Sequence, residues 1–238
     1  LPKTDKDVDD IAKELNISHN DIKSRIIELH EQNPMLGHRG CRLGISFPEI
    51  YKMQCQAIFE ALADCKKKKI RLVVPEIMIP LVSTATEIQI LRNLVDETAE
   101  KIQKFRSVKI KYYVGTMIEL PRAALRAKEI ARFADFFSFG TNDLTQTTFG
   151  ISRDDSAKFL NDYVENKIFN KDPFVSIDER GVGELIKIAT ERGRLEKKSL
   201  KLGICGEHGG DPTSIDFCEK AKLNYVSCSP YRVPVARL

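Results

Sequence analysis

Short apolar runs alternate with longer amphipathic stretches over most of the chain. The apolar runs span residues 70–78, 112–117, 136–139, 202–205 and 225–228. Apolar positions at helical spacing predict helices over 48–65, 84–105, 121–132, 181–192 and 212–221. Buried runs separated by helices are typical of parallel strands joined by right-handed crossovers. The pattern therefore predicts an α/β fold around a parallel sheet.

Two regions depart from this rhythm. Residues 4–32 predict a helical hairpin, with Thr4 and Asp5 capping its first helix and Ser18 its second. A loop over residues 33–42 follows, because two glycines and a proline interrupt any periodicity there. Residues 150–180 show no clear period, and we expect them to form a surface excursion between two strand–helix units.

Composition narrows the class of protein without naming a function. Apolar residues make up 42% of the 238 and charged residues 30%, which is typical of a globular protein. The net charge of +4 is too balanced to predict a nucleic-acid or membrane-surface partner. No apolar stretch approaches the roughly 18 to 20 residues that span a bilayer, and no signal-peptide pattern opens the chain. We expect a cytoplasmic protein or one of an organelle matrix, with its six cysteines reduced.

Polar residues gather where the predicted strands end. Glu119, the Thr141-Asn142-Asp143 segment and Cys205 all lie at or just beyond the carboxyl ends of apolar runs. In a (β/α)₈ barrel this edge is the catalytic face. In an open doubly wound sheet it is the ligand crevice. Both architectures predict a functional site at this edge.

Glu119 and Asp143 are separated by one strand–helix unit and are candidates for a metal site. Carboxylates at adjacent strand ends can meet, and their oxygens are the hard ligands that Mg²⁺ prefers. The alternative is that Glu119 caps the helix beginning near Pro121 and Asp143 caps its own helix. The Gly140-Thr141-Asn142 segment before that helix is a candidate cradle for a carboxylate or phosphate, because backbone amides can approach an anion there.

Cys205 lies between glycines at a strand end, so it is either a small core residue or a nucleophile or proton donor. Cys228 competes for the same role on pattern alone. Arg39, next to a glycine in the 33–42 loop, is a candidate anion clamp because its guanidinium offers a planar fork. His38 and His208 have a catalytic interpretation and a plainer one as hydrogen-bonded loop histidines.

Several strings together resemble the phosphoenolpyruvate (PEP)-utilising enzymes. Phe-Phe-Ser-Phe-Gly-Thr-Asn-Asp-Leu-Thr-Gln, at 136–146, is similar to the signature that pyruvate phosphate dikinases, PEP synthases and Enzyme I of the sugar phosphotransferase system share. Residues 33–42, 203–212 and 225–234 resemble the dikinase family in particular. The resemblance covers essentially the whole chain.

The resemblance implies a (β/α)₈ barrel, with the helical hairpin at 1–32 and the carboxyl-terminal portion of a PEP/pyruvate-binding barrel at 33–238. About three early strands and two substrate arginines of the family's barrel are not matched. It implies Glu119 and Asp143 as Mg²⁺ ligands and Cys205 as the acid/base thiol, with Cys228 structural. The substrate contacts that it implies come from Arg39, Glu119, Gly140, Thr141, Asn142 and Asp143.

The function that the resemblance implies is Mg²⁺-assisted enolisation of pyruvate and phosphoryl exchange with a phosphohistidine on another domain. The whole reaction converts ATP, pyruvate and phosphate to AMP, PEP and diphosphate, with the nucleotide site on other domains. We expect a homodimer through the barrel and no turnover by residues 1–238 alone. Alternatives are a PEP synthase or Enzyme I barrel, an enolate lyase or pyruvate kinase-like barrel that needs no thiol, and a non-catalytic pyruvate-binding or dimerisation fragment.

Overall fold

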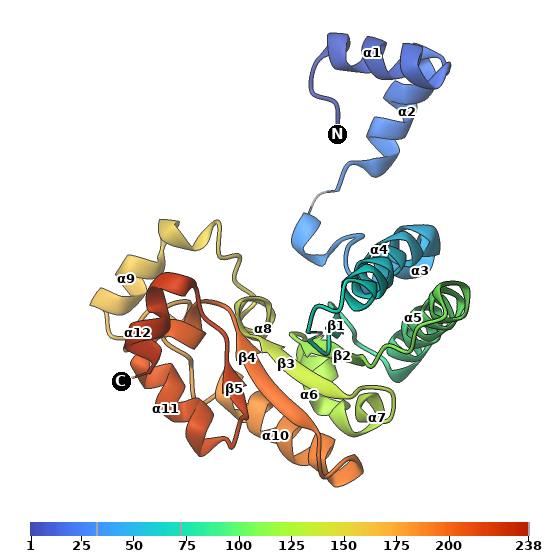
Figure 1. Cartoon of the computed structure of the whole chain (residues 1–238). Helices are drawn as coiled ribbons and strands as arrows, with labels where there is room; N and C mark the ends of the chain where they lie inside the picture. Colours follow the sequence, from blue (N-terminus) through green and yellow to red (C-terminus); the bar gives the residue numbers. More distant parts are fainter. Residues whose placement is uncertain (32, 72, 238) are drawn as a thin grey trace. The chain divides into compact units, whose positions relative to one another are not determined.

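A computed structural model describes residues 1–31, 33–71 and 73–237 of the chain (Figure 1). The chain divides into two compact units, Leu1–Arg39 and Gly40–Leu238. Among the described residues, no helix has the length and hydropathy needed to cross a membrane.

The first unit contains the two predicted helices, α1 (Asp5–Leu15) and α2 (His19–Leu29), followed by the short turn η1 (Pro34–Leu36). Thr4 caps α1 in a capping box with Asp7, and Ser18 caps α2. Both hydroxyls accept a hydrogen bond from a backbone N–H that the first helical turn leaves unpaired. The sequence therefore predicted both starts, although Asp5 lies in the first turn of α1 and does not cap it.

The second unit is built on a five-stranded parallel sheet with the strand order β1-β2-β3-β4-β5. The strands are β1 (Glu76–Ile79), β2 (Tyr113–Ile118), β3 (Phe136–Gly140), β4 (Lys201–Cys205) and β5 (Tyr225–Val226). Because the order is sequential and crossovers are right-handed, every connection turns the same way and the crossover helices lie on one face. A doubly wound sheet would reverse its order at a switch point, so that alternative is wrong.

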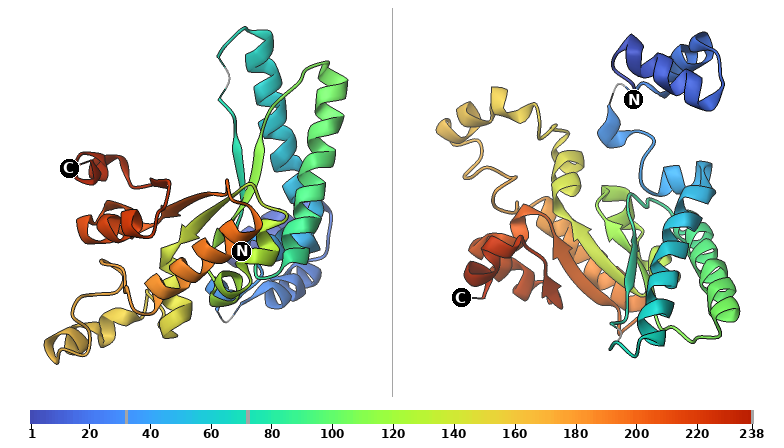
Figure 2. Two further views of the ribbon diagram at one scale, coloured as in Figure 1. Left: turned by 90° about the horizontal axis from the view of Figure 1, so that it is seen from below. Right: turned by 45° about the horizontal axis from the view of Figure 1, so that its top comes forward.

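The helices predicted over 48–65, 84–105, 181–192 and 212–221 are present in this unit, together with others that the pattern did not predict (Figures 1 and 2). They are α3 (Cys41–Ser46), α4 (Pro48–Lys67), α5 (Ala85–Arg106), α6 (Pro121–Leu125), α7 (Ala127–Ala131), α8 (Thr141–Phe149), α9 (Leu160–Glu165), α10 (Val182–Glu196), α11 (Pro212–Lys220) and α12 (Val233–Ala236). Three further turns are η2 (Ser156–Lys158), η3 (Glu207–Gly210) and η4 (Pro230–Arg232). The predicted helix over 121–132 is two short helices, because Arg126 leaves helical geometry at φ −110° and ψ 20°.

The two faces of the sheet carry different side chains, because successive residues of a strand point to opposite faces. We call the face under the crossover helices the helix face. It carries Ile77, Ile79, Val114, Thr116, Ile118, Phe137, Phe139, Leu202, Ile204 and Val226. We call the opposite face the site face. It carries Glu76, Met78, Tyr113, Gly115, Met117, Phe136, Ser138, Gly140, Lys201, Gly203, Cys205 and Tyr225.

The site face is curved inward. Lys201 Nζ on β4 lies 2.7 Å from Glu76 Oε1 on β1, although β2 and β3 run between these strands. Neighbouring strands are about 4.8 Å apart and side chains stand roughly perpendicular to a sheet, so the three spacings of a flat sheet would hold the two charges apart. Sequential order and inward curvature are both consistent with a TIM-like barrel.

The first apolar run forms less strand than predicted. Among the described residues of the run 70–78, only the last three belong to β1, and Ile70, Val73 and Val74 are exposed. Pro75 has no N–H to donate to a strand ladder and disfavours helical geometry at the residue before it. Pairing with β2 begins at Pro75, whose carbonyl accepts from Tyr113 N at 3.0 Å.

Candidate active site

Three neighbouring strands bring Glu119, Gly140 and Cys205 to one edge of the site face. Glu119 follows β2 directly, Gly140 ends β3 and Cys205 ends β4. The Glu119 side chain is only 3% exposed, and its Oε1 accepts a hydrogen bond of 2.6 Å from Leu81 N. The capping alternative for Glu119 is wrong, because Leu120 is the N-cap of α6 and makes no side-chain cap.

Gly140 has no side chain, and the Glu119 side chain occupies the space where one would lie. A Cβ at this position would lie 2.8 Å from Glu119 Oε2 and 2.7 Å from Met117 Sδ, closer than real Cβ contacts allow. Helix α8 starts directly after Gly140, so Asp143 lies in its first turn, where the helix dipole favours a negative charge. Asp143 does not cap this helix, because Gly140 holds the N-cap position. Instead its Oδ1 accepts from Gln146 Nε2 at 2.9 Å.

The Cys205 thiol shares an electrostatic environment with both carboxylates. Burial is the main cause that raises the pKa of this thiol, and the charges of Glu119 and Asp143 raise the pKa further. A hydrogen bond with Ser138 works in the opposite direction. The structure therefore brings together the three predicted residues Glu119, Asp143 and Cys205, and the resting form of the thiol is protonated.

Sequence reasoning missed two neighbours of this thiol, Ser138 and Tyr225. Ser138 lowers the pKa of both the Cys205 thiol and the Tyr225 hydroxyl, and the thiol itself donates to the Phe139 carbonyl oxygen at 3.5 Å. Ser138 lies two residues before Gly140, so strand alternation puts it on the same face. Its signal in the sequence is a single polar residue inside the apolar run 136–139. Tyr225 begins the last run, and its ring covers Gly203, where a Cβ would lie 2.0 Å from the ring.

Thr141 and Asn142 begin α8 beside the loop that follows Cys205. Thr141 Oγ1 lies 3.1 Å from the Cys205 carbonyl oxygen and 2.7 Å from His208 Nδ1. Within the described part of the chain, the buried Asn142 Oδ1 has no hydrogen-bond partner. Gly206 lies next to both residues and has φ +107°, a value that side-chain-bearing residues rarely adopt. An unpartnered acceptor therefore lies at the edge where the site was predicted.

Cys228 and Arg39 are two further candidates, and the structure describes Arg39 only within the first unit. Cys228 follows β5 and lines a separate cavity of about 200 Å³ together with Gly206 and Arg232. Arg39 belongs to the first unit, where its Nη1 lies 3.4 Å from the Met35 carbonyl oxygen and 3.6 Å from Met35 Sδ. The role of Arg39 as an anion clamp therefore stays a prediction.

The chain is similar to known proteins over nearly its whole length. Residues 3–238 match the family profile described as the PEP-binding domain of PEP-utilising enzymes. The chain belongs to this family. It is 60% identical over 238 residues to a pyruvate, phosphate dikinase of Rhizobium meliloti (strain 1021), covering 100% of this chain and 26% of that protein.

Two further relatives carry the same enzyme name. A pyruvate, phosphate dikinase of Clostridium symbiosum is 52% identical over 100% of this chain and 27% of its own length. Pyruvate, phosphate dikinase 1, chloroplastic, of Arabidopsis thaliana is 55% identical over 100% of this chain and 25% of its own length. The chain thus spans about a quarter of the length of these relatives.

The donor set of this PEP-utilising domain fits a hard cation. Glu119 and Asp143 offer carboxylate oxygens, and Asn142 Oδ1 is a buried acceptor without a partner among the described residues. In those parts of the chain there is no group of three or more His, Cys, Asp or Glu side chains that could hold a metal ion. Mg²⁺ keeps several water or substrate oxygens as ligands, so two carboxylates are a sufficient protein contribution.

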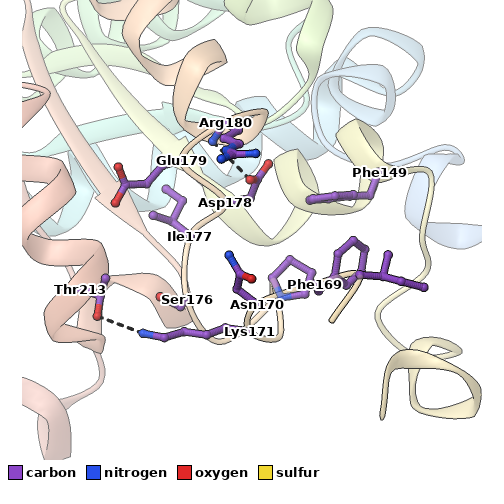
Figure 3. Close-up of a pocket in the computed structure, with 12 residues that line it drawn as sticks. Phe149, Phe169, Asn170, Lys171, Ser176, Ile177, Asp178, Glu179, Arg180 and Thr213 are labelled. Atoms are coloured by element: carbon purple, nitrogen blue, oxygen red, sulfur yellow. Dashed lines mark hydrogen bonds between the residues drawn. The ribbon is translucent and has the colours of Figure 1, made fainter. Parts of the chain in front are cut away.

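A second cavity, of about 370 Å³, has neither Glu119 nor Asp143 in its wall, and its lining residues are drawn in Figure 3. Its wall includes Phe149 at the end of α8, Phe169 and Lys171 in the excursion, and Thr213 in α11. Lys171 Nζ lies 3.4 Å from Thr213 Oγ1 (Figure 3). Pro173 also lines this cavity, and its carbonyl oxygen lies 2.9 Å from His208 Nε2. The predicted surface excursion is thereby tied to the loop that follows Cys205.

Proposed function

We propose that this chain is the PEP/pyruvate-binding catalytic domain of a pyruvate phosphate dikinase. One observation carries the proposal: a partly buried thiol lies beside two carboxylates at the ends of three adjacent parallel strands. The names of the relatives and the matched PEP-binding family support it. The five strands would form part of a (β/α)₈ barrel, which their sequential order and the curvature of the site face support.

Cys205 would carry the proton at the substrate's reacting carbon. Toward PEP, its thiolate removes a methyl proton from pyruvate, and the enolate oxygen attacks the phosphorus of a phosphohistidine on another domain while the P–N bond breaks. Toward pyruvate, the histidine takes the phosphoryl group and the Cys205 thiol protonates the enolate carbon. The raised pKa of this thiol suits the second direction, since the resting form is a proton donor. The hydrogen bond from Ser138 stabilises the thiolate that the first direction requires.

Glu119 and Asp143 would hold Mg²⁺. When bound, this ion supplies stabilisation of the negative charge on the enolate oxygen. Gly140, Thr141 and Asn142 would contact the substrate, with the orphaned Asn142 Oδ1 as an acceptor at the edge of the site. Arg39 would bind the carboxylate or phosphate group of the substrate. The family resemblance also supports a homodimer through this domain, which sedimentation of the purified protein would test.

The decisive experiment follows pyruvate methyl protons exchanging into deuterated buffer with Mg²⁺, in the full-length protein that contains this chain. Cys205→Ala should abolish the exchange while pyruvate still binds by calorimetry, because the variant keeps the carboxylates and loses the proton carrier. Cys228→Ala is the matched control and should exchange like the unsubstituted protein. If Cys205→Ala exchanges normally and Cys228→Ala does not, the assignment of the thiol is wrong.

The same protein tests the phosphoryl donor. A dikinase should form PEP from ATP and pyruvate only when inorganic phosphate is present, and should release diphosphate. Formation of PEP without phosphate would instead indicate a PEP synthase. Pyruvate binding without any proton exchange would indicate a non-catalytic module.

A further inference from the structure

His208 connects two segments that are far apart in the sequence. Its imidazole is 0% exposed and lies in η3, three residues after Cys205. On one side Nε2 is 2.9 Å from the Pro173 carbonyl oxygen, in the excursion before α10. On the other side Nδ1 is 2.7 Å from Thr141 Oγ1, which in turn lies 3.1 Å from the Cys205 carbonyl oxygen. These contacts form a continuous chain of polar atoms from Pro173 to the candidate catalytic cysteine.

Counting protons shows that this chain has two states. Three contacts need three protons, and both carbonyl oxygens can only accept. A neutral imidazole brings one proton and the Thr141 hydroxyl another, so one contact is left without a proton. An imidazolium brings two, and every contact is then a hydrogen bond. In that state Nε2–H donates to Pro173, Nδ1–H donates to Thr141, and the Thr141 hydroxyl donates to the Cys205 carbonyl.

Neighbouring groups shift the pKa of the His208 imidazole in opposite directions. Burial lowers the pKa of His208, and Arg153 in the loop after α8 has the same effect. The Pro173 carbonyl, Asp211 at the N-cap of α11 and Asp172 beside Pro173 raise the pKa. The net direction is down, so the neutral, proton-short state prevails at neutral pH and proton uptake completes the network.

The carbonyl at the end of this chain belongs to a constrained peptide. Gly206 has φ +107°, and a Cβ there would lie 3.0 Å from Thr141 Oγ1. The Thr141 hydroxyl therefore packs directly against the Cys205–Gly206 peptide. We propose that His208 is a positioning residue that, on taking up a proton, commits the Thr141 hydroxyl to the Cys205 carbonyl and so holds the thiol-bearing loop in place. The hydrogen-bond network does not depend on the proposed function. Only its effect on catalysis rests on that function.

The first test measures the network without catalysis. Exchange of the imidazole C2 hydrogen, followed by mass spectrometry over a range of pH, reports the titration of single histidines in an intact protein. Tryptic peptide 202–220 contains His208 and no other histidine. Thr141→Val removes the acceptor for Nδ1–H and should lower the titration midpoint by about one pH unit. Thr141→Ser keeps the hydroxyl and should leave the midpoint unchanged. Equal midpoints in Thr141→Val and the unsubstituted protein would overturn the proposed network.

The second test measures proton exchange of pyruvate in the full-length protein. The rate ratio between the unsubstituted protein and His208→Gln should approach about tenfold below the His208 midpoint, since misplacing a catalytic group costs rate. Above the midpoint the ratio should fall toward one, and KM for pyruvate should stay within about twofold because His208 itself is not among the proposed substrate contacts. His30→Gln, which removes an exposed imidazole in the first unit, is the control.

A double variant tests the route through Thr141. If His208 acts through this hydroxyl, His208→Gln should add no further loss to Thr141→Val. Losses that multiply would overturn the proposal, as would a rate ratio that does not change with pH. Absence of exchange in the unsubstituted protein would count against the proposed function alone, because the imidazole titration still tests the network. If His208→Gln fails to fold, the two Thr141 variants still decide the outcome.

Discussion

The two faces of the sheet differ in kind although they share the same strands. On β3, Phe137 and Phe139 point to the helix face and are fully buried. Between and beside them, Ser138 and Gly140 point to the site face, next to the thiol and Glu119. The helix face is apolar except for Thr116, whereas the site face mixes glycines, hydroxyls and charges with Met78, Met117 and Phe136. Substitutions on the helix face should therefore mainly change the stability of the fold. Substitutions on the site face should mainly change the proposed catalytic activity.

The largest effect is expected from Phe137→Ala. The ring packs against Gly193 of α10, and its removal leaves a cavity that the close-packed helix cannot fill. The free energy of unfolding should fall by about 3 to 5 kcal/mol in equilibrium urea denaturation. Phe105→Ala, at a ring that is 80% exposed, is the control and should change it by less than about 0.5 kcal/mol. A small loss at Phe137 would show that the helix face does not hold the sheet together.

The helix face was largely readable from the sequence, because hydrophobic runs mark buried parallel strands. Each of the five predicted runs overlaps an observed strand, although only residues 76–78 of the first run do so. The runs did not show which residues point to which face of the sheet. Glycines such as Gly115 and Gly203 are not polar, so the odd-numbered and the even-numbered positions of a strand both look apolar. Pro75 shortened β1 and Arg126 divided a helix, and both depend on local backbone geometry that a periodic pattern does not encode.

The candidate site was predictable only where chemistry coincides with a strand end. Glu119, Asp143 and Cys205 satisfy that condition, and the structure brings them together. Ser138 and Tyr225 lie within apolar runs, where Ser138 shows only as one polar residue among apolar ones and Tyr225 gave no separate signal. The contact between His208 and Pro173 joins residues 35 positions apart, which only the folded chain reveals. The roles of Arg39 and of Mg²⁺ stay predictions.

On the site face, Gly140→Ala should affect function more than its effect on stability suggests. The added Cβ would meet Glu119 Cβ at 2.9 Å and Oε2 at 2.8 Å, so the carboxylate must move. Overpacking of this kind costs about 1 to 3 kcal/mol in urea unfolding. Exchange of pyruvate protons should be lost, because the displaced carboxylate no longer faces the substrate. Ser138→Ala adds no bulk, and an equal loss of stability there would contradict the steric explanation.

A carboxylate beside the helix face should contribute a pH-dependent stability. Asp135 accepts from Val114 N at 3.1 Å and pairs with Lys197 Nζ at 2.9 Å and Arg92 Nη1 at 3.1 Å. Burial raises the pKa of this carboxyl, but the bond from Lys197 and the other partners outweigh it and lower the pKa below 3.8. Its contribution is therefore complete above that value and is lost as pH falls through the folded-state pKa.

Asp135→Asn measures that contribution. The variant should lose about 1 to 2 kcal/mol of unfolding free energy near pH 7, as expected for charge-assisted hydrogen bonds. The difference from the unsubstituted protein should shrink as the solution is acidified below pH 4, since both proteins then carry an uncharged group. A difference that stays constant to pH 3 would mean that the carboxylate charge does not stabilise the fold.

The smallest effect is expected for the ion pair between Lys201 and Glu76 on the site face. Its measurement tests whether the sheet curves inward. The Lys201 and Glu76 side chains are 47% and 31% exposed, so their coupling should be below about 1 kcal/mol in a double-mutant cycle with Lys201→Met and Glu76→Gln. The hydrogen bond with Glu76 raises the pKa of Lys201, so the coupling is present at neutral pH and is lost as pH rises through that raised pKa. Added salt should weaken it. The value matters less than its sign, because β2 and β3 separate the two residues and only an inward-curving sheet lets them couple. A coupling of zero at low salt would remove the argument for curvature and leave strand order as the support for a barrel.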